Sequence, residues 1–437
     1  MLLLTIIVLL FLLLLLIGVV KLHPFLSFIL VALIAGWWLG IPLQTLVSSV
    51  KNGIGQLMGD LLLTIGLGAM LGKLIAESGA AQQIANSLIQ LFGKKKLQWA
   101  MMITGFIVGI PLFYNVGFIL LVPLVFSLTH TTKLPIIYIA IPMLAALSVT
   151  HGFLPPHPSP VAITAQLNAE TGKVLFYGLL VAIPTVIIAG PLFAQTIKNV
   201  KASPLSIFVQ PIIDPSSLPG KWVSFICALM PVLLISFFSL IQYNINNPAN
   251  YPSFTFWGDP SIVLLVSLLF SFFALGIARK VSVKKIMQYF TDAIQDISPI
   301  LLIIAGAGAL KQVLIDSGIS KELGMAFNHI DINPLILGWL IAATIRVCIG
   351  SATVAALTAA GIIAPLLHTV AFDANLMVLA IGAGSLMFSH INDSGFWMFK
   401  SYFNLTVKET LKTWSLMETI VSIVGLIGVL ILNQLFI

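Results

Sequence analysis

The sequence predicts an all-α polytopic membrane protein with two inverted-topology repeats, each of about five transmembrane helices plus one re-entrant helical hairpin. Three observations lead to this prediction: the composition, the long apolar segments and the motifs shared by the two halves. Only 8% of the 437 residues are charged and 59% are hydrophobic, so an ordinary water-exposed surface could not be assembled. The apolar runs are continuous rather than alternating, which favours helices over a transmembrane β-barrel.

Each half contains six apolar segments, and all but the fourth come close to the roughly 20 residues that cross a hydrocarbon core of about 30 Å. They fall at 2–20, 22–40, 57–76, 99–128, 134–150 and 174–197, then at 222–242, 259–279, 296–315, 335–368, 375–389 and 415–436. A polar, proline-rich stretch separates the two sets. We therefore expect a first repeat at 1–197, a cytoplasmic linker at 198–221 and a second repeat at 222–437. Segment 2–20 lacks a basic leader and a small-residue cleavage site, and is expected to be a retained helix.

Short motifs recur about 240 residues apart, which indicates an internal repeat. The matched residues are Gly66, Gly68, Ala69, Glu77, Ser78 and Gly79 with Gly306, Gly308, Ala309, Asp316, Ser317 and Gly318. The fourth segment of each half is too long for one span and is interrupted, at 109–115 and at 350–353. Broken backbone is tolerated at membrane depth only where it is buried or lines a watery cavity. Each interruption is therefore interpreted as a re-entrant hairpin, which enters and leaves the membrane on the same side. Each half then crosses the membrane five times, and because five is odd the second half must be inverted relative to the first.

Loop charges agree with this topology when both chain ends are placed outside the cell. Cytoplasmic segments then hold most of the basic residues, whereas the outside holds only Lys51, Lys173 and Lys321. The formal charge of +7 is thus explained by cytoplasmic loops, and no nucleic-acid partner is expected. Cys227 and Cys348 have no spacing partner, so packing roles are expected rather than a disulfide or a metal site.

Paired interruptions predict a binding site at the membrane midplane, where half-helix N-termini face an anionic substrate. The substrate-binding candidates here are Tyr114, Asn115, Gly350, Ser351 and Thr353, which offer hydroxyl, amide and backbone groups. The alternative is that small residues merely allow close helix packing. Arg346 precedes the second interruption, where it could neutralise a substrate carboxylate or pair with a nearby acid.

Two polar clusters supply the remaining candidates. The first runs from His151 to Pro160, where four prolines predict an extended segment, and the second from Ser389 to Phe396. We expect His151, Asn392 and Ser394 to contact the substrate, and Asp393, His390 and His151 to couple protons, because ionisable groups beside apolar spans are functional by default. The alternative, a solvated interfacial loop, applies most to His157.

Other ionisable residues are interpreted as structural. Glu77 and Asp316 are expected at interfacial span ends beside Ser78 and Ser317, and Lys73 and Lys311 are expected to extend toward water. Asp60 and Asp296 open the third segment of their halves, where a helix N-terminus would favour a carboxylate.

The stretch from Ser148 to Pro158 closely resembles the signature of the gluconate permease family of proton symporters, within a wider ion-transporter superfamily. The stretch from Phe388 to Lys400 with Tyr402, Phe403, Asn404 and Leu405 does so too, and the similarity spans nearly the whole chain. The resemblance implies proton-coupled uptake of gluconate or a close sugar acid across a bacterial inner membrane, with the proton as coupling ion and no other cofactor. An acidic residue is frequent in the family where this chain has Asn115. This departure argues against proton carriage at that position and leaves Asp393 and the histidines as candidate proton carriers.

Rival interpretations are an anion channel, a membrane enzyme using His151, His157 and Asp393, and a permease of the same family for idonate, glycerate or D-serine. Titratable residues beside broken helices favour a gated site over an open pore. No metal-ligand spacing, nucleophile elbow or phosphate loop supports an enzyme. Whether the chain forms a homo-oligomer is left open by the sequence.

Overall fold

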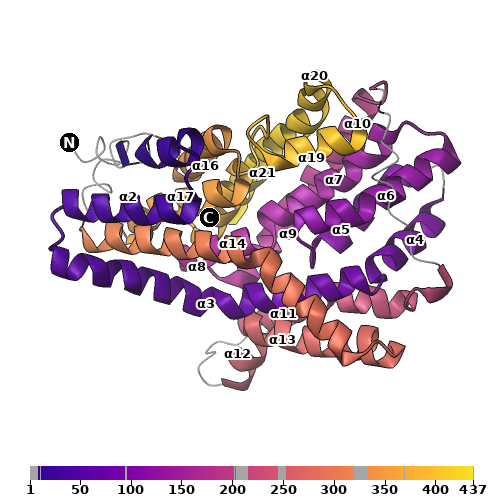
Figure 1. Cartoon of the computed structure of the whole chain (residues 1–437), viewed down its shortest axis with the longest axis horizontal. Helices are drawn as coiled ribbons and strands as arrows, with labels where there is room; N and C mark the ends of the chain where they lie inside the picture. The colour runs from indigo at the N-terminus through magenta and orange to yellow at the C-terminus, as the bar shows by residue number, and fades with distance from the viewer. Residues whose placement is uncertain are drawn as a thin grey trace.

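The computed structural model describes residues 8–9, 11–93, 96–200, 202, 215–244, 252–318, 332–368 and 370–436. Within these ranges the regular structure is helical (Figure 1). The first half contains α2 (Pro24–Trp38), α3 (Leu43–Glu77), α4 (Ala80–Phe92), α5 (Leu97–Gly109), α6 (Tyr114–Thr132), α7 (Ile136–Phe153), α8 (Pro158–Gln166), α9 (Thr171–Ile187) and α10 (Phe193–Thr196). The second half contains α11 (Lys221–Asn244), α12 (Pro252–Gly258), α13 (Pro260–Ser271), α14 (Val283–Asp316), α16 (Pro334–Ile349), α17 (Ala352–Ile363), α18 (Ala374–Gly384), α19 (Ser394–Phe403), α20 (Val407–Thr410) and α21 (Leu416–Phe436).

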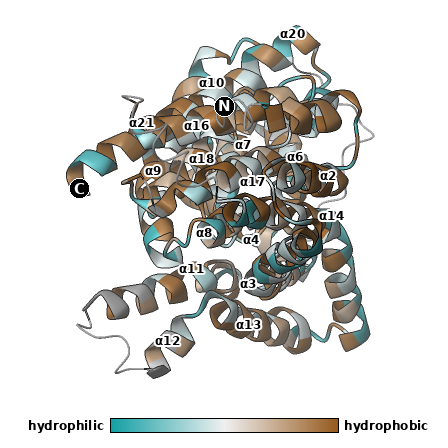
Figure 2. Ribbon diagram, turned by 90° about the vertical axis from the view of Figure 1, so that its left-hand side faces the viewer, coloured by the Kyte–Doolittle hydropathy of each residue, from teal (hydrophilic) through white to brown (hydrophobic). Residues whose placement is uncertain are grey.

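The predicted membrane protein is confirmed at the level of apolar helices. Six helical stretches of the described chain are long and apolar enough to cross a membrane, and the bent helix α3 would make a seventh. Hydrophobic residues, coloured brown, make up most of the helical ribbon in Figure 2. Many large ones are exposed, including Trp37, Trp38, Trp222, Phe237, Leu269, Phe273 and Ile431. An apolar exterior of this extent is suited to lipid.

The two longest helices, α3 and α14, lie side by side in opposite directions (Figure 1). Their backbones meet where Gly53 and Gly308 face each other, since a Cβ atom built on Gly53 would lie 2.3 Å from the carbonyl oxygen of Gly308. Farther along the pair, Lys73 Nζ lies 3.3 Å from Asp296 Oδ2. Only glycine permits so close a helix crossing, which is common in membrane proteins.

The centre of the protein is formed by α7 and α18, one from each half of the chain. Nearly every residue of both helices is buried. In the first half α5 packs on α7, and in the second half α16 packs on α18. The halves interlock because α18 also contacts α7, α8 and α9, while α21 contacts α7 and α9.

Several helices were not predicted. The helix α4 is amphipathic rather than apolar, and it buries Ala80, Ala81, Ile84, Ala85 and Leu88. The helix α8 begins with Pro158 in its first turn, a position that proline fits well, so the extended segment is limited to 154–157 rather than the whole proline cluster. The helix α19 is short and carries polar residues between its buried aromatic rings.

Some predicted placements are wrong or lie outside the described residues. Asp60 and Asp296 do not open helices, because α3 begins at Leu43 and α14 at Val283. Cys348 is exposed, whereas Cys227 is buried as expected. Glu77 and Asp316 do end their helices, followed by Ser78 and Ser317. The predicted linker and the 242–258 connector are described only in part, and Lys94, Lys95 and Lys321 are not described.

Candidate substrate-binding site

The interruption in the second half separates α16 from α17 by two residues. Gly350 adopts a φ of 81°, a left-handed conformation that glycine adopts at little cost. A Cβ atom at this position would lie 2.2 Å from the carbonyl oxygen of Asn392. Ser351 then caps α17, its side chain accepting a hydrogen bond from the Val354 amide. The break is thus packed directly against the second polar cluster.

That cluster holds a buried ion pair. Arg346, in the last turn of α16, donates from Nη2 to Asp393 Oδ2, and the Ser389 hydroxyl donates to the same oxygen. The other oxygen, Oδ1, caps α19 by accepting from the Gly395 amide at 2.9 Å. Arg346 is only 4% exposed, and its Nε and Nη1 atoms have no hydrogen-bond partner among the described residues. Unused guanidinium donors in a buried place can hold a second anion.

The interruption in the first half lies between α5 and α6, at residues 110–113. His157 packs against this interruption, and its Nε2 atom is hydrogen-bonded at 2.6 Å to the carbonyl oxygen of Gly109 at the end of α5. This bond gives His157 a structural role. The His151 ring meets the His157 ring edge-on, with centroids 5.3 Å apart, and is tilted against the Tyr114 ring at 6.5 Å. Neither Nδ1 of His151 nor the Tyr114 hydroxyl finds a partner in the described part of the chain.

The last span adds three residues that the sequence analysis did not select. A π-helical turn, Leu411–Ser415, precedes α21, and such turns frequently occur at functional sites. From it Trp414 donates to the Ser389 hydroxyl at 2.7 Å, and the Ser415 hydroxyl donates to the Ser389 carbonyl. One turn later, Glu418 accepts from the Ser148 hydroxyl of α7. A lone carboxyl inside an apolar span was the signal that could have identified Glu418.

These groups surround a cavity of about 220 Å³, called here the inner cavity. Its walls include most predicted site residues: Tyr114, Asn115, His151, Arg346, Gly350, Ser351, Thr353, Asp393 and Ser394. The beginnings of three helices, α6, α17 and α19, contribute to the lining, so three positive ends of helix dipoles meet there. Two predicted residues lie elsewhere: His390 and Asn392 both bind the Val347 carbonyl oxygen, at 2.9 and 2.7 Å.

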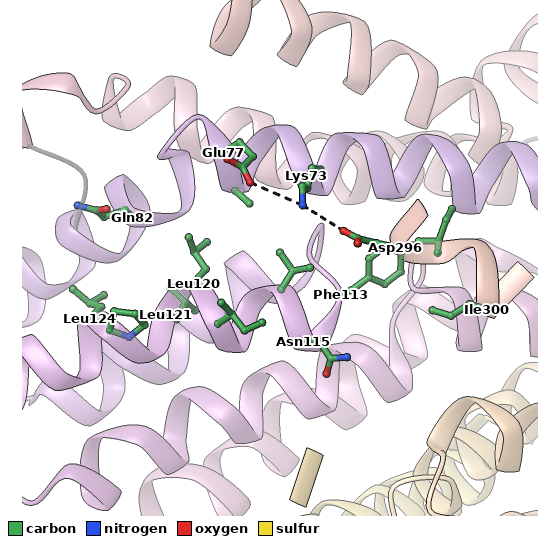
Figure 3. Close-up of a pocket in the computed structure, with 15 residues that line it drawn as sticks. Lys73, Glu77, Gln82, Phe113, Asn115, Leu120, Leu121, Leu124, Asp296 and Ile300 are labelled. Carbon is green, nitrogen blue, oxygen red and sulfur yellow. Dashed lines mark hydrogen bonds and ion pairs between the residues drawn. The ribbon is translucent and has the colours of Figure 1, made fainter. Parts of the chain in front are cut away.

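A second, larger cavity of about 630 Å³, called here the vestibule, adjoins the first. The two share Phe113, Asn115 and Ile300 as lining residues. In Figure 3, Lys73 lies between Glu77 and Asp296 on one side, facing Leu120 and Leu121 on α6, and Asn115 lies toward the far edge. Two carboxylates surround the one lysine, so these three side chains carry net negative charge and do not favour an anion. The vestibule is suited to passage, and the inner cavity to binding.

The inner cavity combines positive potential with hydroxyl groups and titratable side chains. Arg346 and the helix N-termini supply the positive potential, while Tyr114, Ser351 and Thr353 supply the hydroxyl groups. Asp393, Glu418 and His151 can exchange protons. No group of three or more metal-ligating side chains occurs in the described ranges.

Comparison with known proteins agrees with this description. The family model of the GntP family permeases matches residues 1–435. The chain is 46% identical to a high-affinity gluconate transporter of Escherichia coli K12 over 95% of both chains. It is 44% identical to the Gnt-II system L-idonate transporter of the same organism, over 94% of both. It is also 44% identical to a gluconate permease of Bacillus subtilis 168, over 94% of this chain and 95% of that one.

Two solved structures share the fold at low sequence identity. The YdaH transporter of Alcanivorax borkumensis is 14% identical with a TM-score of 0.66, covering 95% of this chain and 98% of its own. The antimetabolite efflux pump MtrF of Neisseria gonorrhoeae is 15% identical with a TM-score of 0.65, covering 95% of both chains. The fold described above is therefore one that solved transporters use.

Proposed function

The chain belongs to the GntP family of permeases, and from this premise we propose that it takes up gluconate or a related sugar acid by proton symport through alternating access. The observation that supports this most directly is Arg346, buried beside a cavity with two nitrogen atoms that have no partner in the described structure. A carboxylate of the substrate would bind these donors. The volume of about 220 Å³ is below the roughly 300 to 1,000 Å³ of drug-sized ligand sites, as suits a small metabolite.

Hydroxyl groups around Arg346 would recognise the rest of the substrate. Tyr114, Ser351 and Thr353 line the same cavity, and a polyol chain offers both donors and acceptors to such groups. Asn115, Gly350, His151 and Ser394 complete the wall on the side of the helix breaks. Asn392 acts indirectly in this proposal, because its amide binds the Val347 carbonyl rather than the cavity.

Proton coupling follows from charge balance in the cavity. Asp393 depends on Arg346 as its counter-ion, and a substrate carboxylate would share that one cation. The carboxyl group of Asp393 would then take up a proton, with His151 nearby as a further acceptor. His390 is a weaker candidate because its ring is bound to Val347. Coupling also solves an energetic problem, since moving a monoanion into a negative interior costs about 2.3 kcal/mol per 100 mV.

The proposal includes the inverted-repeat topology, with re-entrant hairpins at α5–α6 and α16–α17 and both chain ends outside. It is supported by the antiparallel packing of α3 and α14, which hold equivalent places in the two halves. The equivalent pairs α5 with α7 and α16 with α18 support it further. Labelling of single cysteines from each side tests it: residues 94–96 and 243–258 should be accessible from opposite faces. Labelling of both from one face would refute the topology.

Transport is tested with the purified protein in liposomes and labelled gluconate. We expect saturable uptake that accelerates when the external pH is lowered at constant internal pH. Competition by idonate, glycerate and D-serine at two pH values would define the preferred acid. Non-saturable flux would indicate a channel, and competition by D-serine alone would contradict a sugar-acid substrate.

The role of Asp393 is tested by Asp393→Asn, which keeps the shape but cannot carry a proton. Proton-driven accumulation of gluconate should be lost, while exchange of internal for external gluconate persists. The matched control is Asp296→Asn in the vestibule, which should accumulate gluconate normally. Unchanged accumulation by Asp393→Asn would remove this residue as a proton carrier.

A further inference from the structure

We propose that Glu418 is a second proton-binding residue of the transport cycle, so that each sugar-acid anion enters with two protons and one net positive charge. This inference rests on the proposed symport and concerns the same cavity. Its starting point is burial: Glu418 is 2% exposed and lies within α21, a helix of the apolar span Val407–Leu435. An ionised carboxylate in such a place is costly unless it is paired.

The bonding of Glu418 differs from that of Asp393. Asp393 is bound by a guanidinium, a hydroxyl and a backbone amide, so both of its carboxylate oxygens have partners. Glu418 receives a single hydrogen bond, from Ser148. Its second oxygen, Oε2, is buried without a partner among the described residues, and the salt bridges found there do not include it. A protonated carboxyl fits this position without a counter-ion and can donate a hydrogen bond from Oε2 into the cavity.

The other titratable or charged side chains that line the inner cavity with Glu418 come from four elements. They are Arg346 of α16, Asp393 at the start of α19, His151 of α7 and Tyr114 of α6. The helices α9 and α18, which also pack against α21, contribute no titratable side chain to the described lining. Arg346 is the only strong cation among these groups, and Asp393 already binds it.

Charge balance then sets the number of protons. With a bound monoanion and both acidic residues ionised, the inner cavity holds three carboxylates against one guanidinium, a net charge of −2. One proton on Asp393 and one on Glu418 make the closed, loaded cavity neutral. When the cavity is open to the vestibule, water can reach it and an ionised Glu418 is stabilised by solvent and by the free donors of Arg346. Glu418 would therefore release its proton on the side where the substrate leaves.

The test measures how gluconate accumulation depends on the membrane potential in the parent and in Glu418→Gln. The amide oxygen of the glutamine can still accept a hydrogen bond from Ser148. In liposomes with a fixed pH gradient, the parent should accumulate about 50-fold more labelled gluconate for each 100 mV, interior negative, because one net charge moves inward. Glu418→Gln should still respond to the pH gradient but change less than 2-fold with potential, since one proton with one anion is neutral. Glu418→Asp should restore the response at least partly. Glu409→Gln, on the same span, is the matched control and should behave as the parent.

If Glu418→Gln binds gluconate but does not transport it, the pH dependence of the Kd for gluconate provides a second test. If binding takes up protons, the Kd for gluconate falls as the pH is lowered. The fall is about 100-fold for each unit of pH when two protons are taken up and about 10-fold when one is. The parent should show the steeper dependence and Glu418→Gln the shallower. An equal pH dependence, or a potential response that survives in Glu418→Gln, would overturn the assignment. If the parent accumulates gluconate with a pH gradient but ignores potential, two-proton coupling is wrong while the proposed symport stands.

Discussion

Replacing Arg346 by glutamine removes the cation of the inner cavity and provides the sharpest test of the binding site. In the parent, Nη2 is bound to Asp393, while Nε and Nη1 are unpartnered among the described residues. If a substrate carboxylate accepts from both free nitrogens, and each charge-assisted bond contributes a net of about 1.5 kcal/mol or more, the loss is about 3 kcal/mol. This corresponds to a Kd for gluconate raised roughly 150-fold. Arg346→Lys keeps the charge but loses the planar donor geometry, so an intermediate loss of about 10-fold is expected.

Binding of labelled gluconate to detergent-solubilised protein measures this effect directly. The matched control is Lys73→Gln, which removes the same charge from the vestibule and should change the Kd less than 3-fold. Stability supplies a second measure, because Arg346→Gln leaves Asp393 buried without its counter-ion, at a cost of about 3–5 kcal/mol. The double variant with Asp393→Asn should regain part of the lost thermal midpoint. Binding by Arg346→Gln within 3-fold of the parent would refute the assignment of Arg346 to the substrate.

Two other predictions concern the helix break and the route to it. Gly350→Ala should lower the thermal midpoint and the folded yield. A left-handed alanine costs about 1–2 kcal/mol, and its Cβ would collide with the Asn392 carbonyl. Gly68→Ala is the control and should leave both quantities unchanged, because no atom lies within 4 Å of the new Cβ. Equal behaviour of the two variants would contradict this account. In the proposed topology residues 94–96 are cytoplasmic, so the end of α3 that lines the vestibule at Glu77 is expected toward that face. Asn115→Cys, in a Cys348→Ser background, should then react with membrane-impermeant maleimide from the cytoplasmic face and be protected by gluconate. Labelling from the outside alone would contradict a vestibule that opens to the cytoplasm.

The sequence allowed the helical membrane class and most of the inner cavity to be predicted, because both depend on local signals. Apolar runs mark the spans, and interruptions such as Gly350 and Ser351 mark where backbone must leave a helix. The repetition of these signals in both halves identified the residues at the start of α6 and α17. The polar cluster around Asp393 was predicted for the same reason.

Other parts of the structure depend on contacts that local patterns do not encode. His390 and Asn392 belong to the same polar motif as Asp393, yet their side chains bind Val347 of α16. Trp414 reaches the site because of the π-helical turn before α21, and Glu418 because Ser148 lies opposite it. The sequence predicts a helix start at Asp296 because the first turns of α14, from Val283, are polar and resemble a loop.

The glycine contact between α3 and α14 limits how the protein can move. Where two backbones touch without side chains between them, neither helix can slide or roll past the other without a collision. The two helices, which lie side by side in Figure 1, are therefore held together at this crossing. In the proposed alternating-access cycle, we therefore expect the motion that exposes the anion to each face in turn to occur in the shorter, interrupted helices.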